Sequence, residues 1–370
     1  MRIAINCRSF LLRHPTGIGR YTSNLVRCLE EIDKGNEYYL YAKKGIFDSK
    51  RTIPKVASRN FLVKIDRLNR GLDRTLGKVD VYHSPSPDSL NISHARIVVT
   101  VHDFVYKAYP QGHTPQTLQT TEQQFRDIVA KASKIICCSE NTRRDLHQYF
   151  KLDKEKSCVI YQGVDKEMFY PLSPPQRDVA RGAIEAKGVH LPFILFVGTV
   201  EPRKNLANLI RAYALLKEQK KFDGQLVCIG MQGWMSEDMS GLRETLESKN
   251  DILFLGYLTN EELRYFYNMA EVFAFPSFYE GFGFPILEAF SCGAAVVTSN
   301  VSSCPEIAQD AALKIDPFQC EEIASAIERI LTDSHLKSEL KQRALKRAGD
   351  FSFLDTARKT LDVYKKLADS

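Results

Sequence analysis

At 370 residues the chain is too long for one ordinary hydrophobic core, and its length favours two domains. Its composition, 44% hydrophobic and 26% charged, is typical of a globular protein, and its apolar runs fall well short of the roughly 18 residues that a membrane span needs. The net charge of +6 is uneven, because residues 1–170 carry 28 Lys and Arg against 18 Asp and Glu, whereas the rest carry 23 against 27.

Cysteine usage and the first residues indicate the cellular compartment. The nine cysteines form no CxxC pair, and Cys137 and Cys138 lie in an apolar run, so we expect reduced and mostly buried thiols. The opening MRIAINCRSF alternates like a strand and lacks the apolar core of a signal peptide. A cytoplasmic location is therefore expected.

Short β-rich runs alternate with amphipathic helices along the first half of the chain. Strands are predicted at residues 2–6, 38–42, 61–65, 79–83, 96–102, 134–138 and 157–161. Gly17 and Gly19 lie at the start of the first helix, where free backbone amides can meet a phosphate, although a tight turn explains them equally well. His102 and His83 lie at the ends of the predicted strands 96–102 and 79–83. Each could be either a packed residue or a site residue.

The stretch DKEMFYPLSPPQRD separates two copies of this pattern. Three prolines in residues 171–175 disfavour helix and strand alike, so residues 171–188 are predicted to be a linker. The second half continues with the strands FILFVG, QLVCIG, DILFLG, VFAFP, AAVVTS and ALKID, and with helices such as 205–218. Several strands are apolar throughout, as in parallel sheets covered on both faces.

The pattern predicts α/β architecture with two doubly wound domains, 1–170 and 189–352, and a last helix at 353–370. In such sheets ligands bind at the carboxyl ends of the strands. The residues that carry chemistry are therefore expected in the loops that directly follow strands.

The loop after FILFVG concentrates positive charge. The strand ends at Gly198, and Arg203 and Lys204 come just before Asn205, a good N-cap for the next helix. Cations beside the positive end of a helix dipole are unfavourable unless an anion balances them. The loop therefore predicts a diphosphate site, with a solvated loop as the alternative.

The stretch VFAFPSFYEGFGFPILEAF has the same strand–turn–helix form. Glu280 lies in the turn among Gly281, Phe282 and Gly283, which can bring backbone amides close to a ligand. Glu288 lies one turn into the helix, where a carboxylate also interacts favourably with the helix dipole. The sequence contains no Asp-x-Asp, P-loop, serine nucleophile elbow or zinc-ligand spacing, so no metal and no cofactor are expected.

These loops resemble the retaining glycosyltransferases of family 4, whose GT-B fold places two Rossmann-like domains across a cleft. The family hallmark, two glutamates separated by seven residues, is matched by Glu280 and Glu288. The resemblance extends to TGIGRYT, VDVYHSP, TVHD, CCSENTRRDL and PEIAQDAALKIDP. The set TGIGRY, HD and EPRKN is most similar to bacterial mannosyltransferase-type enzymes of polysaccharide or lipopolysaccharide assembly. The resemblance also implies that the last helix crosses back to the N-terminal domain.

The resemblance implies four catalytic residues. His102 would lie near the transferred sugar, and Glu280 would bind the sugar hydroxyls. Arg203 and Lys204 would bind the diphosphate and offset the charge on the leaving nucleotide. Many family members carry an arginine where this chain has Thr199, and Arg203 is expected to supply that charge.

The resemblance also implies a set of donor-binding residues. They lie at the start of the first helix, at the end of the strand FILFVG, in the GYLTN loop, in the glutamate turn and at the carboxylate that would bind the ribose. They are Gly17, Gly198, Thr199, Tyr257, Leu258, Gly281, Phe282, Gly283 and Glu288.

The implied function is the metal-independent, retaining transfer of a hexose from a nucleotide diphosphate sugar, with mannose from GDP-mannose as the leading expectation. The acceptor would be a hydroxyl of a glycan or of a polyprenyl or other lipid-linked substrate. A nucleotide-sugar 2-epimerase of the same fold and a non-catalytic sugar-nucleotide-binding protein are the alternatives.

The basic half of the chain suggests a further partner. As a hypothesis, it docks peripherally on the anionic inner face of the cell membrane, and no nucleic-acid partner is expected. The residues behind this hypothesis are Arg59, Lys64, Arg67, Arg70, Arg74 and Lys78.

Overall fold

The computed structural model describes residues 1–11, 17–45, 54–88, 90–231 and 251–369. The chain divides into two compact units, which are described separately. Unit 1 consists of Met1–Gly163 and Ser352–Ser370, and unit 2 consists of Val164–Phe351. No helix in the described ranges combines the length and the apolar composition that a membrane span requires.

The described strands of unit 1 form one parallel sheet in the order β3-β2-β1-β4-β5-β6-β7. These strands are β1 (Arg2–Asn6), β2 (Glu37–Lys43), β3 (Phe61–Asp66), β4 (Val81–Ser84), β5 (Arg96–Val101), β6 (Lys134–Cys137) and β7 (Ser157–Val159). Side chains of β4 and most of β5 are buried, because helices cover both faces of the sheet. The strand predictions therefore hold, with ends displaced by a few residues.

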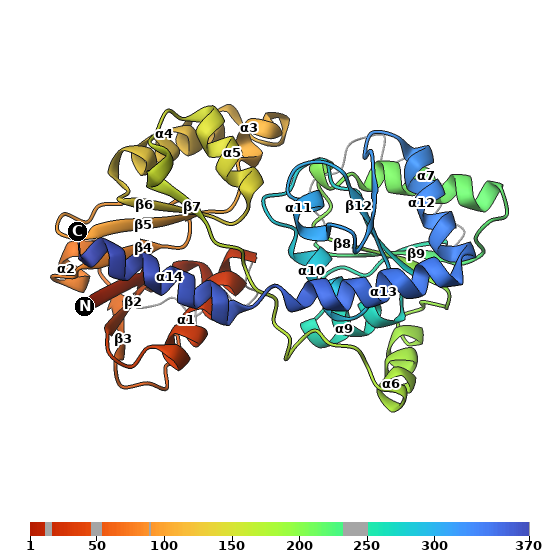
Figure 1. Ribbon diagram of the computed structural model, residues 1–370, viewed down its shortest axis with the longest axis horizontal. Helices are drawn as coiled ribbons and strands as arrows, with labels where there is room; N and C mark the ends of the chain where they lie inside the picture. Colours follow the sequence, from red (N-terminus) through yellow and green to blue (C-terminus); the bar gives the residue numbers. More distant parts are fainter. Residues whose placement is uncertain (12–16, 46–53, 89, 232–250, 370) are drawn as a thin grey trace. The chain divides into compact units, whose positions relative to one another are not determined.

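The helices of unit 1 lie in two layers (Figure 1). One layer packs on the core that includes Val99, Phe104 and Phe125, and it contains α2 (Leu72–Leu76), α3 (Val105–Ala108), α4 (Pro115–Lys131) and α5 (Glu140–Tyr149). The other layer contains α1 (Gly17–Ile32) and the C-terminal helix α14 (Phe353–Ala368), which pack side by side. A Cβ atom at Gly163 would lie 2.1 Å from the backbone nitrogen of Phe353, so only glycine allows this close approach.

Unit 2 repeats the doubly wound arrangement with the strand order β10-β9-β8-β11-β12-β13. Its strands are β8 (Phe193–Val197), β9 (Gln225–Ile229), β10 (Ile252–Phe254), β11 (Val272–Phe275), β12 (Val296–Ser299) and β13 (Leu313–Ile315). Helices α7 (Leu206–Glu218) and α12 (Cys320–Thr332) pack together above the sheet in Figure 1. On the other face lie α9 (Asn260–Met269), α10 (Phe284–Ser291) and α13 (Ser334–Gly349), while α6 (Pro174–Glu185) packs on α9 and α11 (Cys304–Ala308) follows β12.

The predicted linker at 171–188 is wrong over most of its length, because residues 174–185 form helix α6. Pro174 and Pro175 occupy the first helical turn, where a missing amide proton costs nothing, and Ser173 with Gln176 forms a capping box. The preceding segment belongs to unit 2, since Asn268 of α9 accepts a hydrogen bond from the Leu172 amide at 2.8 Å.

Candidate active site

Two loops that carry the predicted site residues meet at one edge of the unit 2 sheet. Strands β8 and β11 are parallel neighbours, so their carboxyl ends lie side by side. The segment 198–205 leaves β8 and the segment 276–283 leaves β11 at this edge. The Phe278 amide donates to the Arg203 carbonyl oxygen at 2.8 Å, which fixes one loop against the other.

Arg203, Lys204 and Glu280 form a buried charge cluster at this edge. Lys204 Nζ lies 2.6 Å from Glu280 Oε1, and an Arg203 guanidinium nitrogen lies 3.1 Å from Glu280 Oε2. Arg203 also contacts a Glu201 carboxylate oxygen at 2.6 Å. The side chains of Lys204 and Glu280 are only 9% and 8% exposed, so their interaction is little screened by water. Each carboxylate is thus compensated by a cation, and the four charges sum to zero.

Burial and the neighbouring charges shift the pKa values of this pair. Burial raises the pKa of the Glu280 carboxyl, but attraction to Lys204 and Arg203 outweighs burial and places that pKa below its ordinary value. Burial also lowers the pKa of Lys204, and the attraction of Glu280 offsets this only in part. Glu280 is therefore ionised near neutral pH, and Lys204 releases its proton more readily than an exposed lysine.

Asn205 has a different role from the one predicted. It precedes α7, but its side chain makes no capping hydrogen bond to the helix, and its backbone is left-handed with φ 59°. Its side-chain amide donates instead to the carbonyl oxygens of Pro276, at 2.9 Å, and Pro317, at 2.6 Å. Asn205 therefore joins the loops that follow β8, β11 and β13.

Hydroxyl groups at the end of β12 and just after it hold the glutamate turn. The Ser303 hydroxyl donates to the carbonyl oxygens of Glu280, at 2.9 Å, and Phe282, at 3.0 Å. The Ser302 hydroxyl accepts from the Glu280 amide at 2.9 Å. The Ser299 hydroxyl donates to the Ser277 carbonyl oxygen at 2.5 Å. We name Ser299, Ser302 and Ser303 the serine ties.

The turn leads into α10 through Gly283, whose φ of 102° is strained for any other residue. Pro285 lies in the first turn of α10, where a missing amide proton costs nothing. Glu288 is buried on this helix, and the hydroxyl of Tyr267 on α9 donates to Glu288 Oε2 at 3.0 Å. The structure therefore fixes the Glu288 carboxylate, and its contact with a ribose stays a prediction.

The remaining unit 2 candidates lie in the loops after β8 and β10. A Cβ atom at Gly230 would lie 2.1 Å from the Gly198 carbonyl oxygen, so the loops after β8 and β9 touch backbone to backbone. Thr199 is half-buried beside Gly198. Tyr257 is 52% exposed, whereas Leu258 is buried, so of these two side chains Tyr257 presents the larger accessible surface to a ligand.

His102 lies in unit 1 at the carboxyl end of β5, and both of its ring nitrogens are engaged. His102 Nε2 donates to the Pro85 carbonyl oxygen at 2.7 Å, and Nδ1 accepts from the Gln162 side-chain amide at 2.9 Å. Burial lowers the pKa of His102, although Pro85 and Asp103 oppose this shift. A neutral imidazole whose two nitrogens are both hydrogen-bonded is suited to a positioning role and not to proton transfer.

The other two unit 1 candidates have different environments. Gly17 is the first residue of α1, so its amide belongs to the helix N-terminus, as the sequence indicated. His83 is fully buried between Tyr364 and Thr100, and burial lowers its pKa to about 3. We therefore assign His83 to the packing of α14 and not to the site.

Several residues that support these candidates carry no signal in the sequence. They are the serine ties, together with Tyr267 and Gln162. Their partners become neighbours only through the sheet order and the helix packing, and no local motif marks a buried serine or tyrosine as a hydrogen-bond partner. The stretch PEIAQDAALKIDP was noted for its resemblance, yet it starts just beyond Ser303.

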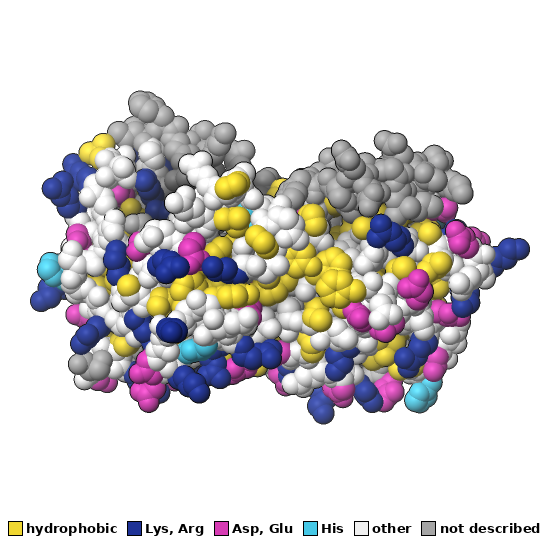
Figure 2. Space-filling model, turned by 90° about the horizontal axis from the view of Figure 1, so that it is seen from above, with side chains coloured by type: hydrophobic (Ala, Val, Ile, Leu, Met, Phe, Trp, Pro, Cys, Tyr) yellow, Lys and Arg dark blue, Asp and Glu magenta, His cyan; other side chains and the backbone are white. Residues whose placement is uncertain are grey.

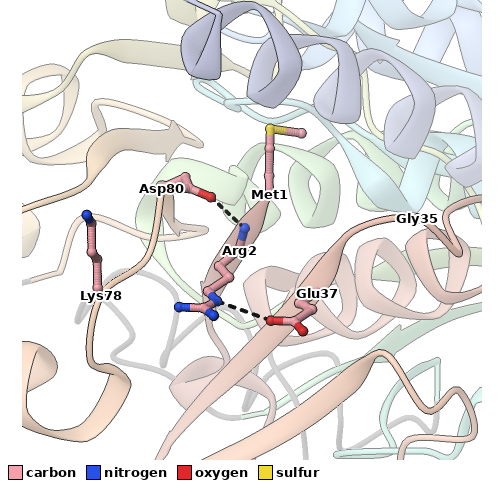
Figure 3. A pocket seen from close by; sticks show the side chains of 6 residues that line it. All are labelled: Met1, Arg2, Gly35, Glu37, Lys78 and Asp80. Atoms are coloured by element: carbon pink, nitrogen blue, oxygen red, sulfur yellow. Dashed lines mark hydrogen bonds and ion pairs between the residues drawn. The ribbon is translucent and has the colours of Figure 1, made fainter.

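A polar cavity of about 490 Å³ lies elsewhere, at the amino ends of the unit 1 strands (Figure 3). Arg2 crosses it and pairs with Glu37 at 3.3 Å, while Asp80 accepts from the Arg2 amide at 2.7 Å. Arg2, Glu37 and Asp80 contact one another, whereas Lys78 makes no ion pair with a described residue, and the cavity lies opposite the edge that carries His102. We do not assign it to the site.

Two further observations concern charge. Within the described ranges, no group of three or more His, Cys, Asp or Glu residues could hold a metal ion, and metal independence stays a prediction. Figure 2 shows Lys and Arg side chains mixed with Asp and Glu on the visible faces of both units.

Comparison with known families matches nearly the whole chain. Residues 15–168 match the sequence model described as Glycosyltransferase Family 4, and residues 183–347 match the model of Glycosyl transferases group 1. The two matches divide the chain much as the two units do.

Similar proteins include bacterial mannosyltransferases. O-antigen chain mannosyltransferase B of Escherichia coli is 29% identical over 96% of this chain and 98% of its own length. Serotype-specific mannosyltransferase WbdA of E. coli is 30% identical over 65% of this chain, which corresponds to 29% of that longer protein. A solved structure of sucrose-phosphate synthase from Thermosynechococcus elongatus has 21% identity and a TM-score of 0.79 over the full length of both chains, which shows the same two-domain GT-B fold.

Proposed function

Because the chain belongs to glycosyltransferase family 4, we propose that it transfers mannose from GDP-mannose to a hydroxyl of a glycan or lipid-linked acceptor with retention of configuration. The observation that carries this proposal is the buried cluster of Arg203, Lys204 and Glu280 at the carboxyl edge of the unit 2 sheet. The choice of mannose follows the names of the two similar mannosyltransferases.

A nucleoside diphosphate suits the charges at this edge. In the cluster the cations are already balanced by carboxylates, so a diphosphate needs further positive potential. The N-termini of α7 and α10 both lie beside the cluster and supply it. An ammonium carries three N–H groups and Glu280 accepts one of them, so Lys204 can bind Glu280 and a phosphate oxygen together. The added negative charge also favours protonated Lys204.

Glu280 is better suited to binding than to nucleophilic attack. Its carboxylate is held by two cations, which stabilise its charge and lower its nucleophilicity. Its remaining lone pairs can accept hydrogen bonds from sugar hydroxyls. Retention would then arise from attack on the same face that the diphosphate leaves, with Lys204 and Arg203 stabilising the departing charge. His102 would lie near the transferred sugar, and because both of its ring nitrogens already bind Pro85 and Gln162, it would orient the sugar by packing against it and not by a hydrogen bond.

The experiment is a transfer assay with GDP-mannose and mannose-containing acceptors, in which the anomeric configuration of the product is read by NMR. We expect a retained α-linkage, and the same rate with and without a chelator. An inverted product would contradict the retaining mechanism, and loss of activity with the chelator would contradict metal independence. A change in the donor sugar without acceptor would favour the epimerase alternative.

A second experiment tests the base of the donor. Thermal unfolding is followed with a panel of nucleoside diphosphates, and GDP is expected to raise the unfolding midpoint most.

A further inference from the structure

A strip of unit 1 carries positive charge that carboxylates of the described residues do not balance. It comprises the edge strand β3, the loop 67–71, α2 and the residues that flank them. Its cations are Arg59, Lys64, Arg67, Arg70, Arg74 and Lys78, and we name this strip the basic edge. None of the six takes part in an ion pair with a described residue, whereas many cations elsewhere in the chain do.

The two acidic residues within the basic edge are occupied inside the protein. Asp66 is buried, and it accepts hydrogen bonds from the Tyr41 hydroxyl at 3.0 Å and from the Arg70 amide at 2.9 Å. Asp73 accepts from the Ser93 hydroxyl at 2.7 Å. The carboxylates thus shape the loop and the helix. Five of the six cations are exposed, and Lys64 is half-buried with its ammonium 4.7 Å from the centroid of the Tyr39 ring.

Apolar side chains stand among these cations. Leu68 is 59% exposed in the loop between Arg67 and Arg70, and Leu62 is 46% exposed on β3. Cations beside an exposed leucine suit the boundary between lipid head groups and acyl chains, where both kinds of side chain find a favourable environment. A nucleic acid would match the charge but would gain nothing from Leu68.

One end of the basic edge, loop 67–71, relates it to the predicted site of unit 1, whereas Arg59 and Lys78 precede β3 and β4 and lie at the other end of the strip. All strand pairs in this sheet are parallel, so loop 67–71 lies at the same edge as His102. Strands β3 and β5 are separated by four interstrand spacings, about 19 Å in all. A lipid surface that meets loop 67–71 would therefore hold a lipid-linked substrate near this edge.

We propose that the basic edge docks the protein on an anionic lipid bilayer, with Leu68 entering the head-group region. The choice of a lipid partner rests on the proposed function, because a lipid-linked acceptor must be met at a membrane. The charge and the exposed leucines are independent of that function.

The test is vesicle co-sedimentation of the full chain with phosphatidylcholine vesicles and with vesicles containing 30% phosphatidylglycerol. We expect binding to the anionic vesicles alone, weakened strongly between 0.1 and 0.5 M salt because surface charges are screened. Equal binding to both vesicles, or binding independent of salt, would overturn the proposal. So would a single-stranded oligonucleotide that binds the protein and displaces it from the anionic vesicles at low concentration.

A matched pair of variants locates the surface. Each cation near an anionic surface strengthens binding about fivefold, so Arg67→Gln, Arg70→Gln and Arg74→Gln together should weaken it about 100-fold. Arg181→Gln, Lys314→Gln and Lys346→Gln remove three exposed cations of unit 2 and should leave binding nearly unchanged. Equal losses in both variants would overturn the assignment. Unfolding midpoints check that both variants fold.

Two readouts complete the test. The chain has one tryptophan, so Leu68→Trp adds a signal whose blue shift with anionic vesicles reports insertion; no shift would overturn the role of Leu68. Donor binding, followed by thermal unfolding with GDP, should be unchanged in the basic-edge variant. Vesicle binding without any transfer would therefore refute the proposed function alone, and transfer without vesicle binding would refute the docking surface alone.

Discussion

At the residue scale, the site of unit 2 depends on Lys204, which must satisfy Glu280 and the donor together. Lys204→Met keeps most of the buried volume but removes the charge, so we expect kcat to fall about 100-fold, roughly 3 kcal/mol. The same change leaves Glu280 with Arg203 as its one cation among the described residues and should lower the free energy of unfolding by about 3 kcal/mol. Steady-state transfer and urea unfolding measure the two effects.

The control separates function from stability. In the double variant Lys204→Met, Glu280→Gln the buried carboxylate loses its charge, so much of the unfolding free energy should return. Transfer should stay low, because neither the diphosphate nor the sugar regains its partner. Recovery of transfer together with stability would show that Lys204 serves only the fold.

The lowered pKa of Lys204 predicts a pH dependence of donor binding. An ordinary lysine has a pKa of about 10.4, and burial places that of Lys204 below its ordinary value. The protonated form binds the diphosphate, so affinity should be full at neutral pH and should fall on the alkaline side before an exposed lysine titrates. The variant Lys204→Arg should lose this alkaline fall, which isothermal titration with GDP from pH 7 to 10 would detect.

Glu201 competes with the donor for Arg203. Its carboxylate lies 2.6 Å from the guanidinium and is 24% exposed, so the pair is partly screened. Glu201→Gln should release Arg203 and lower the KM for the donor about two- to fivefold, with kcat nearly unchanged. Glu280→Gln, which removes the second carboxylate that contacts Arg203, should instead raise KM and lower kcat. A raised KM in Glu201→Gln would show that Glu201 positions Arg203 for the donor.

At the element scale, β12 positions the glutamate turn of its neighbour β11. Ser303→Ala leaves two buried carbonyl oxygens without their donor, which should lower the free energy of unfolding by about 1–3 kcal/mol. Donor KM should rise because the turn is no longer held. Ser291→Ala is the matched control, since that buried hydroxyl on α10 has no hydrogen-bond partner among the described residues. Equal effects on KM in both variants would contradict the role of the serine ties.

Local sequence order predicts part of this site but not its hydrogen-bonded supports. Apolar strands followed by polar loops identify β8 and β11, and with them Arg203, Lys204 and Glu280, because the rule about carboxyl ends depends only on local order. Strand β12 directly follows β11 through α10, so its place beside β11 is expected, but no local motif shows which hydroxyls at its end reach the glutamate turn, and the serine ties therefore carry no local signal. Pro174 and Pro175 misled the prediction because proline breaks a helix interior but suits its first turn.

At the scale of the whole molecule, the chain closes on itself within unit 1, where its last helix packs on the first. His83 of β4 lies between Thr100 and the hydroxyl of Tyr364 on α14, so a residue near the C-terminus completes the first core. The connection joins positions 281 residues apart. Changes at α14 should therefore act on unit 1 before they act on the charge cluster of unit 2.

The free energy of unfolding of unit 1 should fall in acid. Burial lowers the pKa of folded His83 to about 3, against about 6.5 in the unfolded chain, so only the unfolded state binds the proton between these values. The stabilisation that neutral His83 gives the folded state is complete above pH 6.5 and is lost as the pH falls toward 3. At pH 5 the free energy of unfolding should be lower by about 2 kcal/mol. Hydrogen exchange of the β4 and α14 amides at pH 7.5 and pH 5 measures this loss. His83→Gln keeps a hydrogen-bonding side chain without a titrating group, so the difference in free energy of unfolding from the parent chain should narrow by about 2 kcal/mol between pH 7.5 and pH 5. An undiminished difference at pH 5 would contradict the assignment.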